Sequence, residues 1–195
     1  YEARKRDMLL ASLPRPRYAS AFEPGCASGF ISEHLAQRCD RLLEQFHLAD
    51  VLGATGITMT ATTGNIGAAD GIEIDNGTNQ KVTATANGSI WLKEQTGDFR
   101  TNVITSTTST VKLEASGAIV DGNNTSAADI NAALGVILVA SSGGIGEVGL
   151  LELEVGSAGY VSATATGKVW MTELTGNMNV GTITSTNNDV VLTVP

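Results

Sequence analysis

The sequence has no run of 18 or more apolar residues, so no helix within it is expected to span a membrane. Aromatic residues make up only 5% of the chain, and there are two cysteines and four prolines. The first seven residues are not followed by an apolar run with a cleavage site, so no secretion signal is visible. The net charge of −8 argues against general binding of nucleic acids or anionic membranes, which requires clustered Lys and Arg.

Charge is distributed unevenly along the chain. Residues 1–47 carry 7 Lys and Arg against 6 Asp and Glu, whereas residues 48–195 carry 5 against 14. The first segment also holds three of the four prolines and every cysteine and histidine of the chain, namely Cys26, Cys39, His34 and His47. We therefore predict two unrelated modules, residues 1–47 and 57–195, joined by a linker at 48–56.

The second module contains an internal repeat. When position 57 is placed over position 136, the segments 57–116 and 136–195 align without a gap, and 21 of the 60 positions are identical. The matched positions include Trp91 with Trp170, Glu73 with Glu152 and Glu94 with Glu173. A gapless match of this length indicates a duplicated structural unit and favours a repeat architecture.

The local pattern within the repeat is typical of strands. Segments such as Val82–Ala86 and Val111–Ala115 alternate apolar residues with polar ones, mostly Thr, and short Gly- and Asn-containing turns separate them. The interval from Gly97 to Gly117 suggests the length of one coil, and the offset between the two copies is about four times as long, which predicts about four coils per copy. A jelly roll or sandwich would also contain many short strands, but neither needs a gapless duplication. We predict a mainly β fold, a right-handed parallel β-helix (solenoid) preceded by a short α/β fragment.

The segments "TATANGSIWLKEQTGDF" and "ITSTTSTVKLEASGAIVDG" resemble the repeats of filamentous-haemagglutinin-type exoproteins. The resemblance extends over the whole of the second module, 57–195. It implies a secreted or surface-displayed β-helical stalk with a structural or adhesive role, no catalytic residues and a host-surface glycan or protein as partner. Residues 121–129, between the two copies, are expected to form a surface loop.

The first module reads as the opening of an α/β sheet. An apolar run at 18–22 leads into the Gly-rich segment Glu23–Gly29. Apolar residues from Ile31 to Leu43 then recur at helical spacing, and a strand is expected at 41–46. The segments "YEARKRDMLLASLP", "YASAFEPGCASGF" and "SEHLAQRCDRLL" resemble class I S-adenosylmethionine-dependent methyltransferases of the nodulation-protein-S type.

By that resemblance, Glu23, Gly25 and Gly29 would contact the methionine end of the cofactor S-adenosylmethionine. The family pattern has an acidic residue at the end of the following strand, where this chain has Phe46, with Glu44 two residues earlier. The α/β pattern then stops, and one such unit buries too little apolar surface to fold alone. We interpret residues 1–47 as a truncated methyltransferase start. Its helix, taken to extend over about 31–46, could instead cap the first solenoid coil.

Other candidate sites receive simpler interpretations. Cys26 and Cys39 lack a second pair at metal-ligand spacing and are expected to be free thiols, and no catalytic partners surround the histidines. The acidic pairs Glu73/Asp75 and Glu152/Glu154 suggest calcium or carboxylate chemistry, but their alternation with apolar residues favours a solvated strand face.

The same alternation predicts that Trp91 and Trp170 point outward. There they either bind a partner at the surface or pack on the outer face of a neighbouring coil. The duplication predicts that they share one outer face, about four coils apart.

The function predicted from the sequence is therefore non-enzymatic, structural and adhesive, with an extracellular or cell-surface location, no catalytic residues and no metal. The alternative is a methyltransferase, which would be cytoplasmic and would bind S-adenosylmethionine. A β-helical polysaccharide lyase or hydrolase is a weaker alternative, because the repeat contains a single arginine and no clustered Asp/Arg set.

Overall fold

The structure is a computed structural model that describes residues 2–18, 21–24, 42–45, 56–67 and 71–195. The chain divides into two compact units, Tyr1–Ala49 and Asp50–Pro195. Each unit is described by itself.

The first unit contains helix α1 (Glu2–Ser12) and strands β1 (Ala21–Pro24) and β2 (Leu42–Gln45). β1 and β2 pair in parallel, with Ala21 opposite Leu42. Adjacent parallel strands require a long crossover connection, so this pair fits the predicted α/β opening. The strand predicted at 41–46 is confirmed, and a helix extending to residue 46 is therefore wrong at its C-terminal end. The rest of the predicted helix, residues 31–41, lies outside the described residues. Among the described residues, no helix is long and apolar enough to cross a bilayer.

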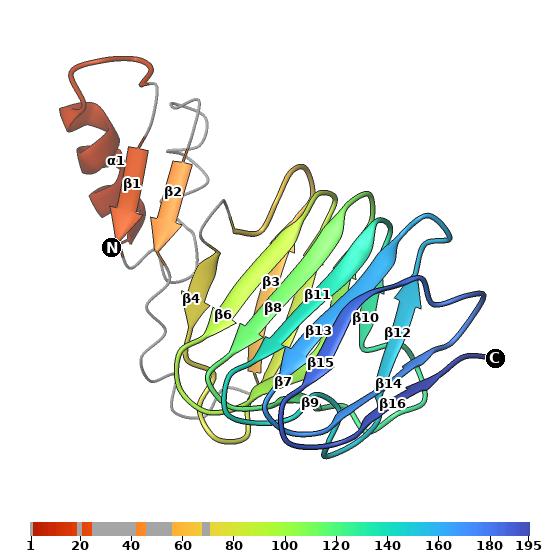
Figure 1. Cartoon of the computed structure of the whole chain (residues 1–195). Coiled ribbons are helices and arrows are strands. Elements are labelled where there is room, and N and C mark those ends of the chain that lie inside the picture. Colours follow the sequence, from red (N-terminus) through yellow and green to blue (C-terminus); the bar gives the residue numbers. More distant parts are fainter. Residues whose placement is uncertain (1, 19–20, 25–41, 46–55, 68–70) are drawn as a thin grey trace. The chain divides into compact units, whose positions relative to one another are not determined.

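The second unit consists of two parallel sheets, which Figure 1 shows as two layers of strands. The eight-stranded sheet contains, in spatial order, β16 (Val190–Thr193), β14 (Val169–Glu173), β12 (Leu151–Val155), β10 (Ile130–Ala132), β7 (Phe99–Ser106), β5 (Lys81–Ala86) and β3 (Gly56–Ala61), with β9 (Ile119–Asp121) also paired to β7. The six-stranded sheet contains β15 (Val180–Ser185), β13 (Tyr160–Ala165), β11 (Gly135–Ala140), β8 (Thr110–Ala115), β6 (Ile90–Glu94) and β4 (Ile72–Ile74).

The chain alternates between the two sheets as it winds, except that β9 and β10 follow one another in the eight-stranded sheet, and strands of successive turns pair. All of the strand pairs of this unit are parallel. The result is a β-solenoid of about six turns, which confirms the prediction of a mainly β fold with stacked parallel strands and excludes a sandwich of antiparallel hairpins.

The core lies between the two sheets and is built from ladders of aligned apolar side chains. One ladder in the six-stranded sheet runs through Leu92, Leu113, Leu138 and Ala163, all fully or almost fully buried, to the partly buried Ile183. Successive strands in a sheet are about 4.8 Å apart, so branched side chains of similar size stack in direct contact. The predicted alternation is confirmed in β5 and β8, where every second residue is buried.

The sequence repeat does not correspond to four turns. Ala84 pairs with Ile104 one turn later, and Ile104 pairs with Ile130 another turn later. The second of these turns contains more residues than the first, because a loop lengthens it. The repeat therefore spans about three and a half turns, and each strand of the first copy has its counterpart in the opposite sheet. For example, β5 lies in the eight-stranded sheet and its counterpart β13 in the six-stranded sheet.

Candidate functional site

The residues predicted to bind a cofactor are only partly described. Glu23 lies in β1, and its backbone is in register with that of Glu44 in β2. Gly25 and Gly29 lie outside the described residues, as do both cysteines, both histidines and Phe46. The acidic residue of β2 that lies level with Glu23 is therefore Glu44.

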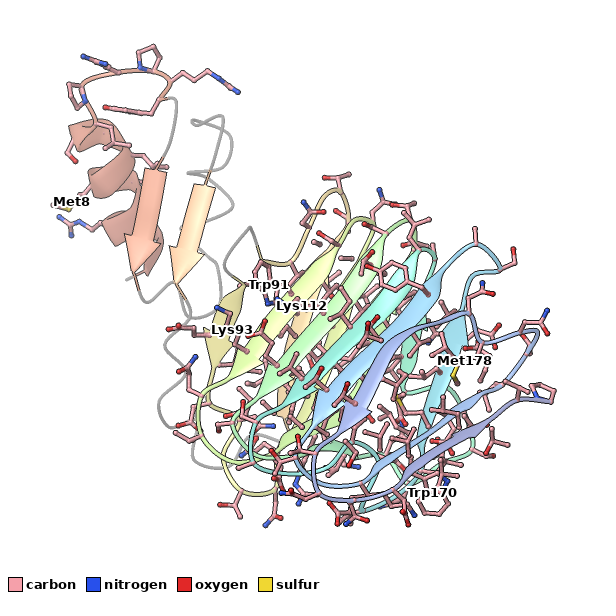
Figure 2. The ribbon with its side chains drawn as sticks, in the orientation of Figure 1. Met8, Trp91, Lys93, Lys112, Trp170 and Met178 are labelled. Carbon is pink, nitrogen blue, oxygen red and sulfur yellow. The ribbon has the colours of Figure 1, made fainter. Side chains whose placement is uncertain are left out.

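Trp91 lies on the outer face of β6, as its alternation predicted, between buried Ile90 and Leu92. The Nζ atoms of Lys112 and Lys93 lie 3.9 and 5.3 Å from the ring centroid. Lys93 lies on β6 with Trp91 and Lys112 on the neighbouring β8, and Figure 2 labels all three residues. The indole Nε1 donates a hydrogen bond of 3.2 Å to Glu114. Trp91 thus packs on the adjacent turn within a set of charged side chains, where cation–π attraction holds the ring in place.

Trp170 is also directed outward, from β14, and Lys168 Nζ lies 4.2 Å from its ring centroid. β14 belongs to the eight-stranded sheet and β6 to the six-stranded sheet. The prediction that the two tryptophans share one outer face is therefore wrong, and Figure 2 shows them on different faces of the unit. The physical reason is that the repeat contains an odd number of half-turns.

Two corresponding carboxylates, Glu94 and Glu173, point into the core at the ends of β6 and β14, and they are 3% and 1% exposed. Glu94 accepts hydrogen bonds from the backbone N–H of Asn76 (3.0 Å) and of Thr96 (3.3 Å). Glu173 accepts one of 2.7 Å from the N–H of Val155. Asn76 and Val155 are themselves equivalent positions of the two copies, so the duplication preserves a carboxylate that bonds to the turn of the preceding coil.

The alternation of the sequence already carries a signal for these buried acids. Strict alternation from Ile90 through Leu92 places Glu94 on the inner face, and Val169 through Met171 does the same for Glu173. Burial raises the pKa of Glu94 from 4.5 to about 7, and repulsion from Asp75 adds to the rise while its backbone hydrogen bonds oppose it. Burial also raises the pKa of Glu173.

A second group of acids comes from three separate segments. Asp121 ends β9, Asp129 directly precedes β10, and Glu152 lies in β12 of the following turn. Each contributes an oxygen atom that lies within 4.8 Å of the other two, and their exposed fractions are 6%, 0% and 7%. We call these three residues the acidic trio. They meet because β9 and β10 both pair with β7 and are separated only by the loop at 122–129.

The hydrogen bonds of the acidic trio leave part of its acceptor capacity unused. Asp121 Oδ1 accepts from the N–H groups of Asn123 and Asn124, both at 2.8 Å. Asp129 accepts from Asn123 Nδ2 (2.8 Å) and from the N–H of Glu152 (3.1 Å). Glu152 Oε2 is buried and has no hydrogen-bond partner among the described residues.

The charges of the acidic trio repel one another. Burial is the largest cause of the raised pKa of Asp129, about 8, and repulsion from Asp121 and Glu152 adds to it. Burial likewise raises the pKa of Glu152, which a hydrogen bond with Asp129 opposes. The ion pairs of the described solenoid, Arg100 with Asp98 and Lys112 with Glu114, involve none of the three. A buried set of this kind must hold either a proton or a cation.

The acidic trio corrects two predictions. Glu152 was expected on a solvated strand face, but it is buried beside the acids of the preceding turn, whereas its counterpart Glu73 is exposed as predicted. Residues 124–127 are exposed as expected of a surface loop, but Asp121 and Asp129 at its two ends are buried. The pattern Asp121-x-Asn123-x-Thr125 followed by Asp129 was a signal in the sequence for oxygen-rich loop chemistry.

No protein-family model, curated protein or solved structure matches the chain.

Proposed function

We propose that residues 57–195 are a non-enzymatic structural and adhesive segment of a secreted or surface-displayed bacterial protein. The observation that carries this proposal is the continuous parallel ladder from Gly56 to Thr193, in which every turn is bonded to the next. Such stacking gives a rigid body whose outer faces repeat at fixed spacing, which suits presentation of a surface. The resemblance to haemagglutinin-type repeats supports the same role.

The outer faces offer the contacts that an adhesive segment needs. Trp91 and Trp170 are partly exposed and are accompanied by Lys93, Lys112 and Lys168. An indole ring beside lysines suits a partner with an apolar sugar face and nearby anionic groups, such as an acidic host-surface glycan. Because the two tryptophans lie on different sheets, we expect them to act as separate contact points.

We expect beads coated with the chain to adhere to immobilised acidic glycans or to host cells, and Trp91→Ala or Trp170→Ala to reduce this adhesion about tenfold. Loss of the ring removes the stacking surface while the ladder of buried residues is kept. Tyr160→Ala is the matched control, because Tyr160 is an outward aromatic residue on β13 that is 42% exposed. Adhesion that is absent in the wild type, or equal in all four proteins, would contradict the adhesive proposal.

The N-terminal unit supports a second candidate, an incomplete S-adenosylmethionine-binding start. The parallel pairing of β1 with β2 is the observation that favours it. A cofactor pocket needs several converging walls, and the described part of this unit supplies two short strands and one helix.

For this reason we expect no measurable binding of S-adenosylmethionine or its demethylated product, up to roughly millimolar concentration, by isothermal titration calorimetry. The chain should likewise transfer no methyl group. Micromolar binding that disappears in Gly25→Val would show that the unit is a functional cofactor site, and the methyltransferase would then be the better assignment.

A further inference from the structure

We propose that the acidic trio, Asp121, Asp129 and Glu152, binds one calcium ion that ties two successive turns of the solenoid together. Asp121 and Asp129 flank the loop of one turn, and Glu152 comes from β12 in the next turn. An ion held by all three would therefore act as a cross-link between turns. The acidic trio includes neither tryptophan, and the inference does not depend on the adhesive role.

The unused acceptor of Glu152 is the observation that points to a ligand. Glu152 is 7% exposed, and its Oε2 atom is buried without a hydrogen-bond partner among the described residues. A buried, unpartnered carboxylate oxygen is costly, and a cation is the partner that relieves both the missing bond and the repulsion from the other two acids. N–H donors already orient the carboxylates of Asp121 and Asp129, so both are held in place before an ion binds.

The chemistry of the acidic trio favours calcium over other metals. All ligand atoms are carboxylate oxygens, which excludes the nitrogen and sulfur ligands that zinc prefers. The oxygens of the trio lie within 4.8 Å of one another, so a single ion can contact all three. Calcium accepts irregular sets of protein oxygens, whereas magnesium demands near-ideal octahedral geometry and usually keeps several waters.

The backbone over Asp121 is built for close approach. Gly149, in the loop before β12, has φ +85°, and a Cβ atom there would lie 3.0 Å from Asp121 Cβ and 3.2 Å from its Oδ2. A larger residue at this position would press on the carboxylate. In the loop at 122–129, Asn123 bonds to both Asp121 and Asp129.

The test is calorimetric titration of the full chain, first freed of metal with EDTA, with calcium chloride. We expect one binding site with Kd of roughly 10⁻⁵–10⁻³ M and a calcium-dependent rise in Tm of roughly 5–10 °C. Asp129→Asn and Glu152→Gln should weaken binding at least about 100-fold, because each replaces a charged ligand by a neutral one. Glu73→Gln, the exposed counterpart of Glu152, is the matched control and should leave binding unchanged.

Thermal unfolding in EDTA keeps the test decisive even if a variant folds poorly. The two amide variants remove repulsion between buried charges, so without metal they should melt at or above the wild-type Tm. Wild type should exceed them only when calcium is present. Absence of binding at about 10 mM calcium chloride, above the range of extracellular calcium modules, would overturn the proposal and leave a proton shared by Asp129 and Glu152. Binding that survives in both variants, or variants that melt well below wild type in EDTA, would also overturn it.

Discussion

Replacement of Gly146 with alanine is expected to lower the free energy of unfolding of the solenoid by more than about 3 kcal/mol. Gly146 has φ +66°, a left-handed conformation that disfavours any residue with a Cβ atom. The added Cβ would also overlap the backbone carbonyl oxygen of Trp170 in the next turn. Backbone atoms cannot rotate away as a side chain can, so the two turns would have to separate, and the hydrogen bond between Trp170 N–H and the Ile145 carbonyl oxygen would be lost.

The matched control for this change is Gly97→Ala. Gly97 has φ +80°, but nothing lies within 4 Å of the position that its Cβ would occupy. This variant therefore tests the left-handed backbone alone, and we expect a loss of about 1–2 kcal/mol. Urea denaturation followed by circular dichroism measures both changes. Equal losses in the two variants would show that the contact between turns at Gly146 is not close in solution.

Glu94→Gln is expected to stabilise the solenoid at pH 8 by about 1–3 kcal/mol and to change its stability little near pH 4.5. The folded-state pKa of Glu94 is raised from 4.5 to about 7, so the folded state holds a proton that the unfolded state releases. Stability contributed by this proton is fully present below about pH 4.5 and is lost as the pH rises through 7. A glutamine remains neutral at all these pH values, and its carbonyl oxygen can still accept the hydrogen bond from Asn76.

Denaturation midpoints of wild type and Glu94→Gln at several pH values between 4.5 and 8 measure this effect as a difference. Other buried acids, including Glu173, change stability with pH in the same direction in both proteins, so the difference isolates Glu94. Glu73→Gln, at an exposed position of β4, is the control for replacing a glutamate that is not buried. A Glu94→Gln protein that is less stable than wild type at pH 8 would mean that the charged carboxylate is favoured in the fold.

The parallel stack could be predicted because its causes are local and repeated. Alternation of apolar and polar residues fixes which side chains of β5, β6 and β8 face the core, and it placed Trp91 and Trp170 outside. The same rule also places Glu94 and Glu173 inside, although glutamate is seldom fully buried. The gapless duplication then indicated that such strands are stacked in turns.

The number of residues in each turn could be learned only from the tertiary structure. Loops at 122–129 and 146–150 lengthen particular turns, and their length decides which strands become neighbours. Because these lengths give the repeat an odd number of half-turns, Trp91 and Trp170 lie on different sheets although their sequences match. No local pattern carries this information.

By itself, then, the sequence determined the strand pattern, the stacked architecture and the direction of most side chains, since each follows from the alternation of neighbouring residues. Only the tertiary structure decided where the acidic trio forms. Asp121 and Asp129 lie at the two ends of one loop and Glu152 lies much further along the chain, and they meet because the winding brings consecutive turns into register. Glu152 is buried beside the acids of the preceding turn, whereas its counterpart Glu73 in the first copy is exposed.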